Sequence, residues 1–157
     1  MRKIYITNGC PFSGKSTWAV KNFVPEQIIE SDLHKYDSER NGKDLTEYLA
    51  TLALNKNSDC VLVQTNNSFN TFKKYYDLLH NDFELVIVNF NRTPDELRLL
   101  RDCSDRVKKS LKKEDRIDWY WEIWNNSLNQ IRTSELWHCL EIPCPQIVNN
   151  DIEGFLV

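Results

Sequence analysis

The feature that most constrains this chain is an octapeptide close to its N-terminus, Gly9-Cys10-Pro11-Phe12-Ser13-Gly14-Lys15-Ser16. Its spacing of glycine, four residues, glycine, lysine and serine is that of a phosphate-binding loop, or P-loop. Glycines let backbone N–H groups turn inward around phosphate oxygens, and the helix that follows directs its positive end to the same place. The octapeptide therefore predicts an anion cradle between a strand and a helix.

The residues of such a loop have separate roles toward a nucleoside triphosphate. Lys15 is expected between the β- and γ-phosphates, Ser16 on Mg²⁺ through its hydroxyl, and Thr17 on the α-phosphate. We therefore expect ATP as the phosphate donor, Mg²⁺ as the cofactor, and every residue from Gly9 to Thr17 in contact with ATP. A tight turn with this spacing by coincidence is the plain alternative, which the flanking strand and helix patterns disfavour.

The rest of the chain alternates between strand and helix patterns. Apolar runs and β-branched residues predict strands over 3–8, 27–30, 60–64 and 85–90, with an edge strand at 146–150. Helical spacing predicts helices over 16–20, 44–54, 69–80 and 114–131, and another that starts with Thr93 as N-cap and Pro94 as its first residue. This order predicts an α/β fold, a parallel sheet of four or five strands with helices on both faces.

The bulk composition fits one domain over residues 1–157. Apolar residues make up 41% and charged residues 27% of the chain, and no run of eighteen apolar residues could span a bilayer. The five cysteines show no Cys-x-x-Cys pair, which favours free thiols in a reducing compartment. His138, Cys139 and Cys144 match no standard zinc spacing. We expect a cytoplasmic protein, located in the host cytoplasm if it is viral, with no membrane partner.

Basic residues gather in one part of an otherwise acidic chain. The net charge is −3, yet residues 98–116 carry eight basic and four acidic side chains. We interpret this segment as a helical lid that closes over the triphosphate and can also contact a polyanionic acceptor. A solvated helix face is the alternative interpretation.

The segment Gly9 to Ala19 resembles the P-loop of the bacteriophage polynucleotide 5′-kinase family, a subgroup of the small P-loop kinases. The resemblance implies a P-loop kinase-like fold and transfer of the γ-phosphate of ATP to the 5′-hydroxyl of a nucleic acid. By position, Asp32 would be the general base and Lys35 would hold the acceptor's 3′-phosphate. Gln64 and Asn66 would contact the acceptor, and Arg101 and Arg106 would be the catalytic arginines of the lid.

Two residues depart from the family pattern. Phe12 stands where the family usually has glycine, so it packs either on a base or within the fold. Gln64 replaces the aspartate that ends the third strand in the family, which leaves a catalytically silent nucleotide-binding regulator as an alternative. Asp32 also suits a helix N-cap, because aspartate is common there.

Aromatic residues of the predicted helix 114–131 suggest nucleic-acid stacking. Tyr120, Trp121 and Trp124 fall on its apolar stripe and are expected in the core. Trp119 lies off the stripe and is the better candidate for stacking on a base. The expected acceptor is therefore a polynucleotide; the alternatives are a hydroxymethylated base in DNA and a nucleoside-sized molecule.

Overall fold

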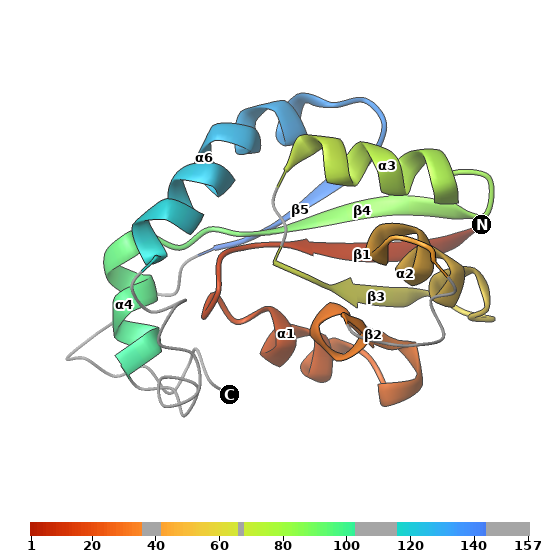
Figure 1. The fold of residues 1–157 in the computed structure, drawn as a ribbon, viewed down its shortest axis with the longest axis horizontal. Helices are drawn as coiled ribbons and strands as arrows, with labels where there is room; N and C mark the ends of the chain where they lie inside the picture. Colours follow the sequence, from red (N-terminus) through yellow and green to blue (C-terminus); the bar gives the residue numbers. More distant parts are fainter. Residues whose placement is uncertain (36–41, 66–67, 103–115, 144–157) are drawn as a thin grey trace.

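One parallel sheet organises the molecule, with the strand order β2-β3-β1-β4-β5 (Figure 1). The computed structural model describes residues 1–35, 42–65, 68–102 and 116–143. Every neighbouring pair of strands runs parallel, so all five carboxyl ends lie on the same edge. The strands are β1 (Arg2–Asn8), β2 (Ile28–Glu30), β3 (Cys60–Val63), β4 (Phe83–Phe90) and β5 (His138–Ile142).

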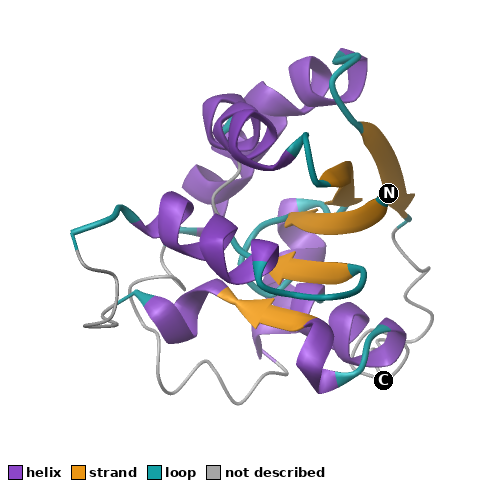
Figure 2. Cartoon of the chain, turned by 90° about the vertical axis from the view of Figure 1, so that its right-hand side faces the viewer, coloured by secondary structure: helices purple, strands orange, loops and turns teal. Residues whose placement is uncertain are grey.

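Helices cover both faces of the sheet (Figure 2), which confirms the predicted α/β class. The helices are α1 (Lys15–Asn22), α2 (Leu45–Leu54), α3 (Phe69–Leu79), α4 (Pro94–Asp102), α6 (Ile117–Thr133), and the 3₁₀ turns η1 (Pro25–Gln27) and η2 (Ser31–His34). Helices α2, α3 and α6 pack on one face and α1 packs on the other. In the part of the chain described, no helix is long and apolar enough to cross a membrane.

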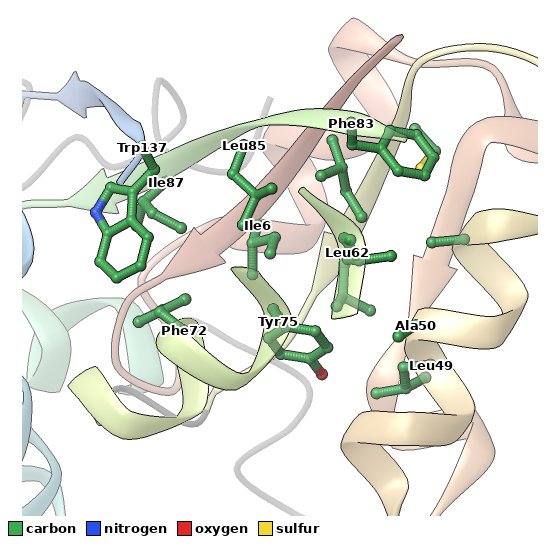
Figure 3. Close-up of a cluster of buried hydrophobic side chains, with 14 of the residues drawn as sticks. Ile6, Leu49, Ala50, Leu62, Phe72, Tyr75, Phe83, Leu85, Ile87 and Trp137 are labelled. Atoms are coloured by element: carbon green, nitrogen blue, oxygen red, sulfur yellow. The ribbon is translucent and has the colours of Figure 1, made fainter. Parts of the chain in front are cut away.

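The main core lies between the sheet and the α2, α3 and α6 layer (Figure 3). Residues of β1 alternate between the two faces, with Ile4 and Ile6 in this core and Tyr5 against α1. All four residues of β3 are buried, as expected for a central strand that is covered on both sides. The side chains that fill this core include Leu49, Ala50, Leu62, Phe72, Tyr75, Phe83, Leu85, Ile87 and Trp137.

Side-chain caps explain where several helices begin. The Asp44 carboxylate accepts a hydrogen bond from the backbone N–H of Glu47 at the start of α2. Before α4, the Thr93 hydroxyl accepts from the N–H of Glu96, and the Glu96 carboxylate accepts from the N–H of Thr93. This reciprocal capping box satisfies two backbone donors and confirms the predicted start of α4 at Pro94.

The fifth strand is β5, which was not predicted as a strand. Its burial pattern is mostly exposed or intermediate, because it pairs only with β4 at the edge of the described sheet. An exposed edge strand lacks the continuous apolar run that identified the central strands. The edge strand predicted at 146–150 lies outside the described residues.

A row of polar side chains ties the carboxyl ends of three neighbouring strands together. Asn8, Asn89 and Glu141 stand opposite one another in register. The Asn8 amide donates to Asn89 Oδ1 (2.7 Å), and the Asn89 amide donates to Glu141 Oε2 (2.6 Å). Arg132 of α6 donates to the other carboxylate oxygen through Nε (2.8 Å). The row thus links α6 to the last residue of β1, directly before the octapeptide.

This row predicts a pH-dependent contribution of Glu141 to stability. Partial burial would raise the pKa of its carboxyl, yet hydrogen bonds from Asn89 and Arg132 outweigh burial and hold that pKa below its ordinary value. A carboxyl whose pKa is lowered by folding stabilises the protein above the unfolded-state pKa, and the contribution disappears as the pH falls through the folded-state pKa. Glu141→Gln should cost about 1 kcal/mol at pH 7, a modest value because the side chain is 40% exposed.

Urea unfolding at several pH values measures this effect. The difference between wild type and Glu141→Gln should shrink once the pH falls below about 4. Glu122→Gln, on the exposed face of α6, is the matched control and should stay within about 0.5 kcal/mol of wild type. A difference for Glu141→Gln that does not change with pH would contradict the electrostatic explanation.

Candidate phosphate-binding site

The octapeptide forms a tight loop between β1 and α1, at the carboxyl edge of the sheet (Figure 1). The backbone N–H of Ser13 donates to the carbonyl of Cys10 (3.2 Å). Gly14 is the N-cap of α1 and has a φ of 95°, a left-handed conformation that glycine adopts without a steric penalty. The loop therefore delivers the N-terminus of α1, the positive end of the helix dipole, to the edge where β1 ends.

Lys15 folds back over this loop. Its ammonium donates hydrogen bonds to the backbone carbonyls of Gly9 (2.9 Å) and Cys10 (2.7 Å). The residue is only 6% exposed, so a positive charge is held inside the turn. Ser16 and Thr17 follow in the first turn of α1 and are half-buried. The loop thus combines a fixed ammonium, a helix N-terminus and two hydroxyl groups, as an anion site requires.

Close packing fixes the first glycine of the loop. A Cβ atom on Gly9 would lie 2.5 Å from the Ser13 hydroxyl oxygen and 2.9 Å from Cβ of Phe90. The Ser13 hydroxyl is itself buried and has no hydrogen-bond partner among the described residues. Position 9 therefore requires glycine, because the loop passes too close to Phe90 of β4 and to Ser13 for a side chain to fit.

Cys10, the second residue of the loop, packs on the helices behind it. Cys10 is buried together with Leu97 of α4 and Trp124 of α6. Burial raises the pKa of the Cys10 thiol to about 12, an effect that the nearby Lys15 ammonium opposes. The thiol therefore stays protonated at neutral pH and acts as a packing group instead of a nucleophile.

Phe12 packs within the fold, which resolves one of the two departures from the family pattern. Its ring is 9% exposed and packs with Leu100 and Leu99 of α4. Its backbone φ is 70°, in the left-handed region that costs a non-glycine residue about 1–2 kcal/mol. Phe12 thus keeps the conformation in which glycine would be unstrained, while its side chain contacts α4.

Gln64, expected to contact an acceptor, follows β3 and is fastened to β1. The Thr7 hydroxyl donates to the Gln64 backbone carbonyl (3.1 Å) and accepts from its N–H (3.0 Å). The Gln64 side chain is 5% exposed, and its Oε1 accepts from the Tyr75 hydroxyl of α3 (2.9 Å). Burial raises the pKa of Tyr75, so this hydroxyl keeps its proton and remains a donor. The Gln64 side chain is therefore held by a hydrogen bond to α3.

Asp32 and Lys35 lie beyond the end of β2, as predicted. The Lys35 ammonium is 3.0 Å from the Asp32 carboxylate, and both side chains are about half exposed. Asp32 is the second residue of η2, whose N-cap is Glu30, so Asp32 is not the N-cap. Because β3 separates β2 from β1, η2 lies two strand spacings, roughly 10 Å, from the end of β1.

The remaining predicted residues are only partly described. Arg101 is in the last turn of α4, where it pairs with the Asp102 carboxylate (2.9 Å). Arg106, Asn66 and most of the predicted lid fall outside the described residues. Trp119 is 52% exposed, with the Arg116 guanidinium 5.9 Å from its ring centroid, whereas Trp124 is buried as predicted.

The donor set around the loop suits Mg²⁺ bound largely through phosphate and water. Ser16 supplies a hydroxyl in the first turn of α1, where it would hold the ion. Mg²⁺ commonly keeps several waters and binds substrate phosphates together with few protein ligands. Within the described ranges, no group of three or more histidine, cysteine or acidic side chains could hold a metal.

The polar row of Asn8, Asn89, Glu141 and Arg132 is the part of the site that sequence reasoning missed. Asn8 is fully buried and precedes Gly9 directly, and its backbone carbonyl accepts from the Trp124 indole (3.3 Å). The available signal was an asparagine at or next to the carboxyl end of two strands, Asn8 in β1 and Asn89 in β4. Its meaning depends on which strands are neighbours.

Comparison with solved structures identifies the fold. A gluconokinase from Sinorhizobium meliloti 1021 matches 92% of this chain over 84% of its own, with 12% identity and a TM-score of 0.59. A fungal RNA kinase matches 98% of this chain over 81% of its own, with 14% identity and a TM-score of 0.60. No family model and no curated protein sequence matches the chain. The chain thus has the P-loop kinase fold, and the specific resemblance to bacteriophage polynucleotide kinases stays a prediction.

The packing at Gly9 leads to a stability prediction. Gly9→Ala should destabilise the protein by about 1–3 kcal/mol, because the added methyl group overlaps Ser13 and Phe90. Thermal unfolding of the purified variants measures the loss. Ser13→Ala removes the closest overlapping atom and a buried hydroxyl without a described partner, so the double variant Gly9→Ala/Ser13→Ala should recover part of the stability. Equal stability of wild type and Gly9→Ala would rule out the steric role of Gly9.

Proposed function

We propose that this protein is an ATP-dependent kinase that transfers the γ-phosphate to a hydroxyl group, with the 5′-hydroxyl of a polynucleotide as the acceptor. The observation that carries the proposal is the loop itself, in which Lys15 is turned inward against the backbone at the N-terminus of α1. Phosphoryl transfer depends mainly on positioning and on neutralising charge. A fixed ammonium beside a helix N-terminus meets both needs.

The proposed reaction assigns a role to each group. The acceptor hydroxyl oxygen attacks the γ-phosphorus, the bond from that phosphorus to the β–γ bridging oxygen breaks, and ADP leaves. Asp32 takes the proton of the attacking hydroxyl, while Lys15 and Arg101 neutralise charge on the phosphates. Mg²⁺, held through Ser16, supplies further charge neutralisation when bound.

The position of Asp32 and Lys35 supports an acceptor that carries its own phosphate. The two side chains meet at the same edge of the sheet as the loop, about half exposed, and roughly 10 Å from the end of β1. A carboxylate beside an ammonium there provides a base for a hydroxyl and a cation for a neighbouring phosphate. Trp119 and Arg116, exposed at the start of α6, add an aromatic and cationic surface that suits single-stranded nucleic acid.

The structural neighbours are compatible with more than one kind of acceptor. One is named a gluconokinase and the other an RNA kinase, so their names alone do not choose between a small molecule and a polynucleotide. A hydroxymethylated base in DNA and a nucleoside-sized molecule are the alternative acceptors.

A catalytically silent nucleotide-binding regulator is the second candidate function. Gln64 favours this function. It follows β3 at the place where the kinase family has an aspartate, so no carboxylate is available there, and its side chain accepts a hydrogen bond from Tyr75. Such a protein would bind ATP in the same loop but transfer no phosphate. The two candidates therefore differ in turnover and agree in nucleotide binding.

A panel of acceptors tests the proposal. Purified protein, Mg²⁺ and γ-labelled ATP are incubated with 5′-hydroxyl oligonucleotides of DNA and of RNA, hydroxymethylated duplex DNA, and free nucleosides. Label should appear on the 5′-hydroxyl oligonucleotides and be lost with Lys15→Ala, because the loop ammonium then no longer stabilises the transferred group. Lys21→Ala, an exposed lysine in the last turn of α1, is the matched control and should retain activity. ATP binding without label in any acceptor would establish the regulator instead.

The role of Asp32 is tested separately. Asp32→Asn should lower kcat by about 10²-fold or more, with ATP affinity close to wild type, because only proton transfer is removed. Steady-state kinetics and ATP titration give the two values. Asp77→Asn is the control. Asp77 is an exposed partner of a lysine on α3, near the end of that helix that leads into the start of β4. An unchanged kcat for Asp32→Asn would exclude Asp32 as the base.

A further inference from the structure

In Phe12 the backbone conformation favours glycine, whereas the buried side chain favours a large apolar residue. Among the described residues it is the only non-glycine residue with a positive φ. Glycine would adopt that φ freely, so the phenylalanine is retained at the expense of backbone strain. Such strain persists only where the surrounding contacts hold it in place.

The contacts of the Phe12 ring are with α4. The ring packs with Leu100 and is flanked by Leu99, and both Phe12 and Leu100 are buried. One turn earlier, Leu97 of α4 packs with Cys10. Two side chains of the phosphate loop thus dock on the same helix, so a shift of the loop is transmitted to α4 through direct contact.

The residue that follows Leu100 is Arg101, whose side chain is one-fifth exposed. Its backbone position is fixed by the packing of Leu100 in front of it. One turn before Arg101, Arg98 reaches Asp118 of α6 (2.5 Å), and Leu97 shares a buried cluster with Trp124 of α6. Helix α4 is therefore held between α6 and the phosphate loop.

We propose that Phe12 is a positioning residue that docks α4 on the phosphate loop and so holds Arg101 next to the transferred phosphate. The inference rests on the proposed function for the role of Arg101. Phe12 acts through α4 and not by touching the substrate. The coupling also runs in reverse, so that occupancy of the loop by a nucleotide stabilises α4.

Three variants separate the ring from the backbone. Phe12→Gly removes the ring and relieves the strained φ, Phe12→Ala removes the ring and keeps the strain, and Phe12→Leu keeps an apolar group against Leu100. If the ring positions Arg101, Phe12→Gly and Phe12→Ala should both lower kcat by about tenfold or more, with a change in ATP affinity below about threefold. Phe12→Leu should lose less than either. A kcat near wild type in Phe12→Gly would overturn the proposal.

A double-mutant cycle with Arg101→Ala tests whether Phe12 acts through that arginine. Combining Phe12→Gly with Arg101→Ala should lower kcat no more than the larger of the two single losses, since both remove the same interaction. Losses that multiply would show that Phe12 has an independent role and would overturn the coupling.

Hydrogen exchange gives a readout that does not depend on phosphate transfer. In wild type, ATP should slow the exchange of backbone amides in residues 94–102 as well as in the loop, whereas in Phe12→Gly the protection should stay within the loop and α1. This result would support the coupling even if no acceptor is labelled. Transfer activity together with α4 amides that do not respond to ATP in wild type would overturn the coupling and leave the proposed function intact.

Discussion

The rest of the structure depends on how the end of β1 is held by its two neighbours. On one side, the Thr7 hydroxyl exchanges two hydrogen bonds with the Gln64 backbone; on the other, the Asn8 amide bonds Asn89. These bonds fix the point at which the chain leaves the sheet. At Gly9 the loop is then packed closely between Phe90 and Ser13. The position of α1, and of its N-terminus at the carboxyl edge of the sheet, follows from this anchorage.

The site is built from backbone groups that are shaped by side chains pointing away from the ligand. Gly14 sets the turn into α1, while Cys10 and Phe12 face α4 and α6. The loop is thus supported from behind by helices that follow β4 in the chain. A preorganised arrangement of this kind can stabilise developing charge without rearranging during the reaction.

Much of this arrangement could be predicted from local patterns. Strand β3 is a continuous apolar run, and β1 and β4 are rich in β-branched and apolar residues; their predicted ends agree with the structure to within two residues. The spacing of the octapeptide predicted the strand, loop and helix around Lys15. Strand β5 could not be predicted in this way, because half-exposed edge residues carry no apolar periodicity. Contacts such as Asn8 with Asn89 join residues 81 positions apart, and only the strand order brings them together. The same limit applies to Phe12, whose contact with α4 depends on the path of the chain after β4.

The two carbonyl contacts of Lys15 have a consequence for selectivity among anions. The ammonium has acceptors in its own loop, so an incoming anion competes with these carbonyls for its hydrogen bonds. A single weakly charged anion gains little from this exchange, because it replaces existing hydrogen bonds with others of similar strength. A polyphosphate chain offers more negative charge and more oxygens to the same ammonium. We therefore expect the loop to bind polyphosphates in preference to small anions.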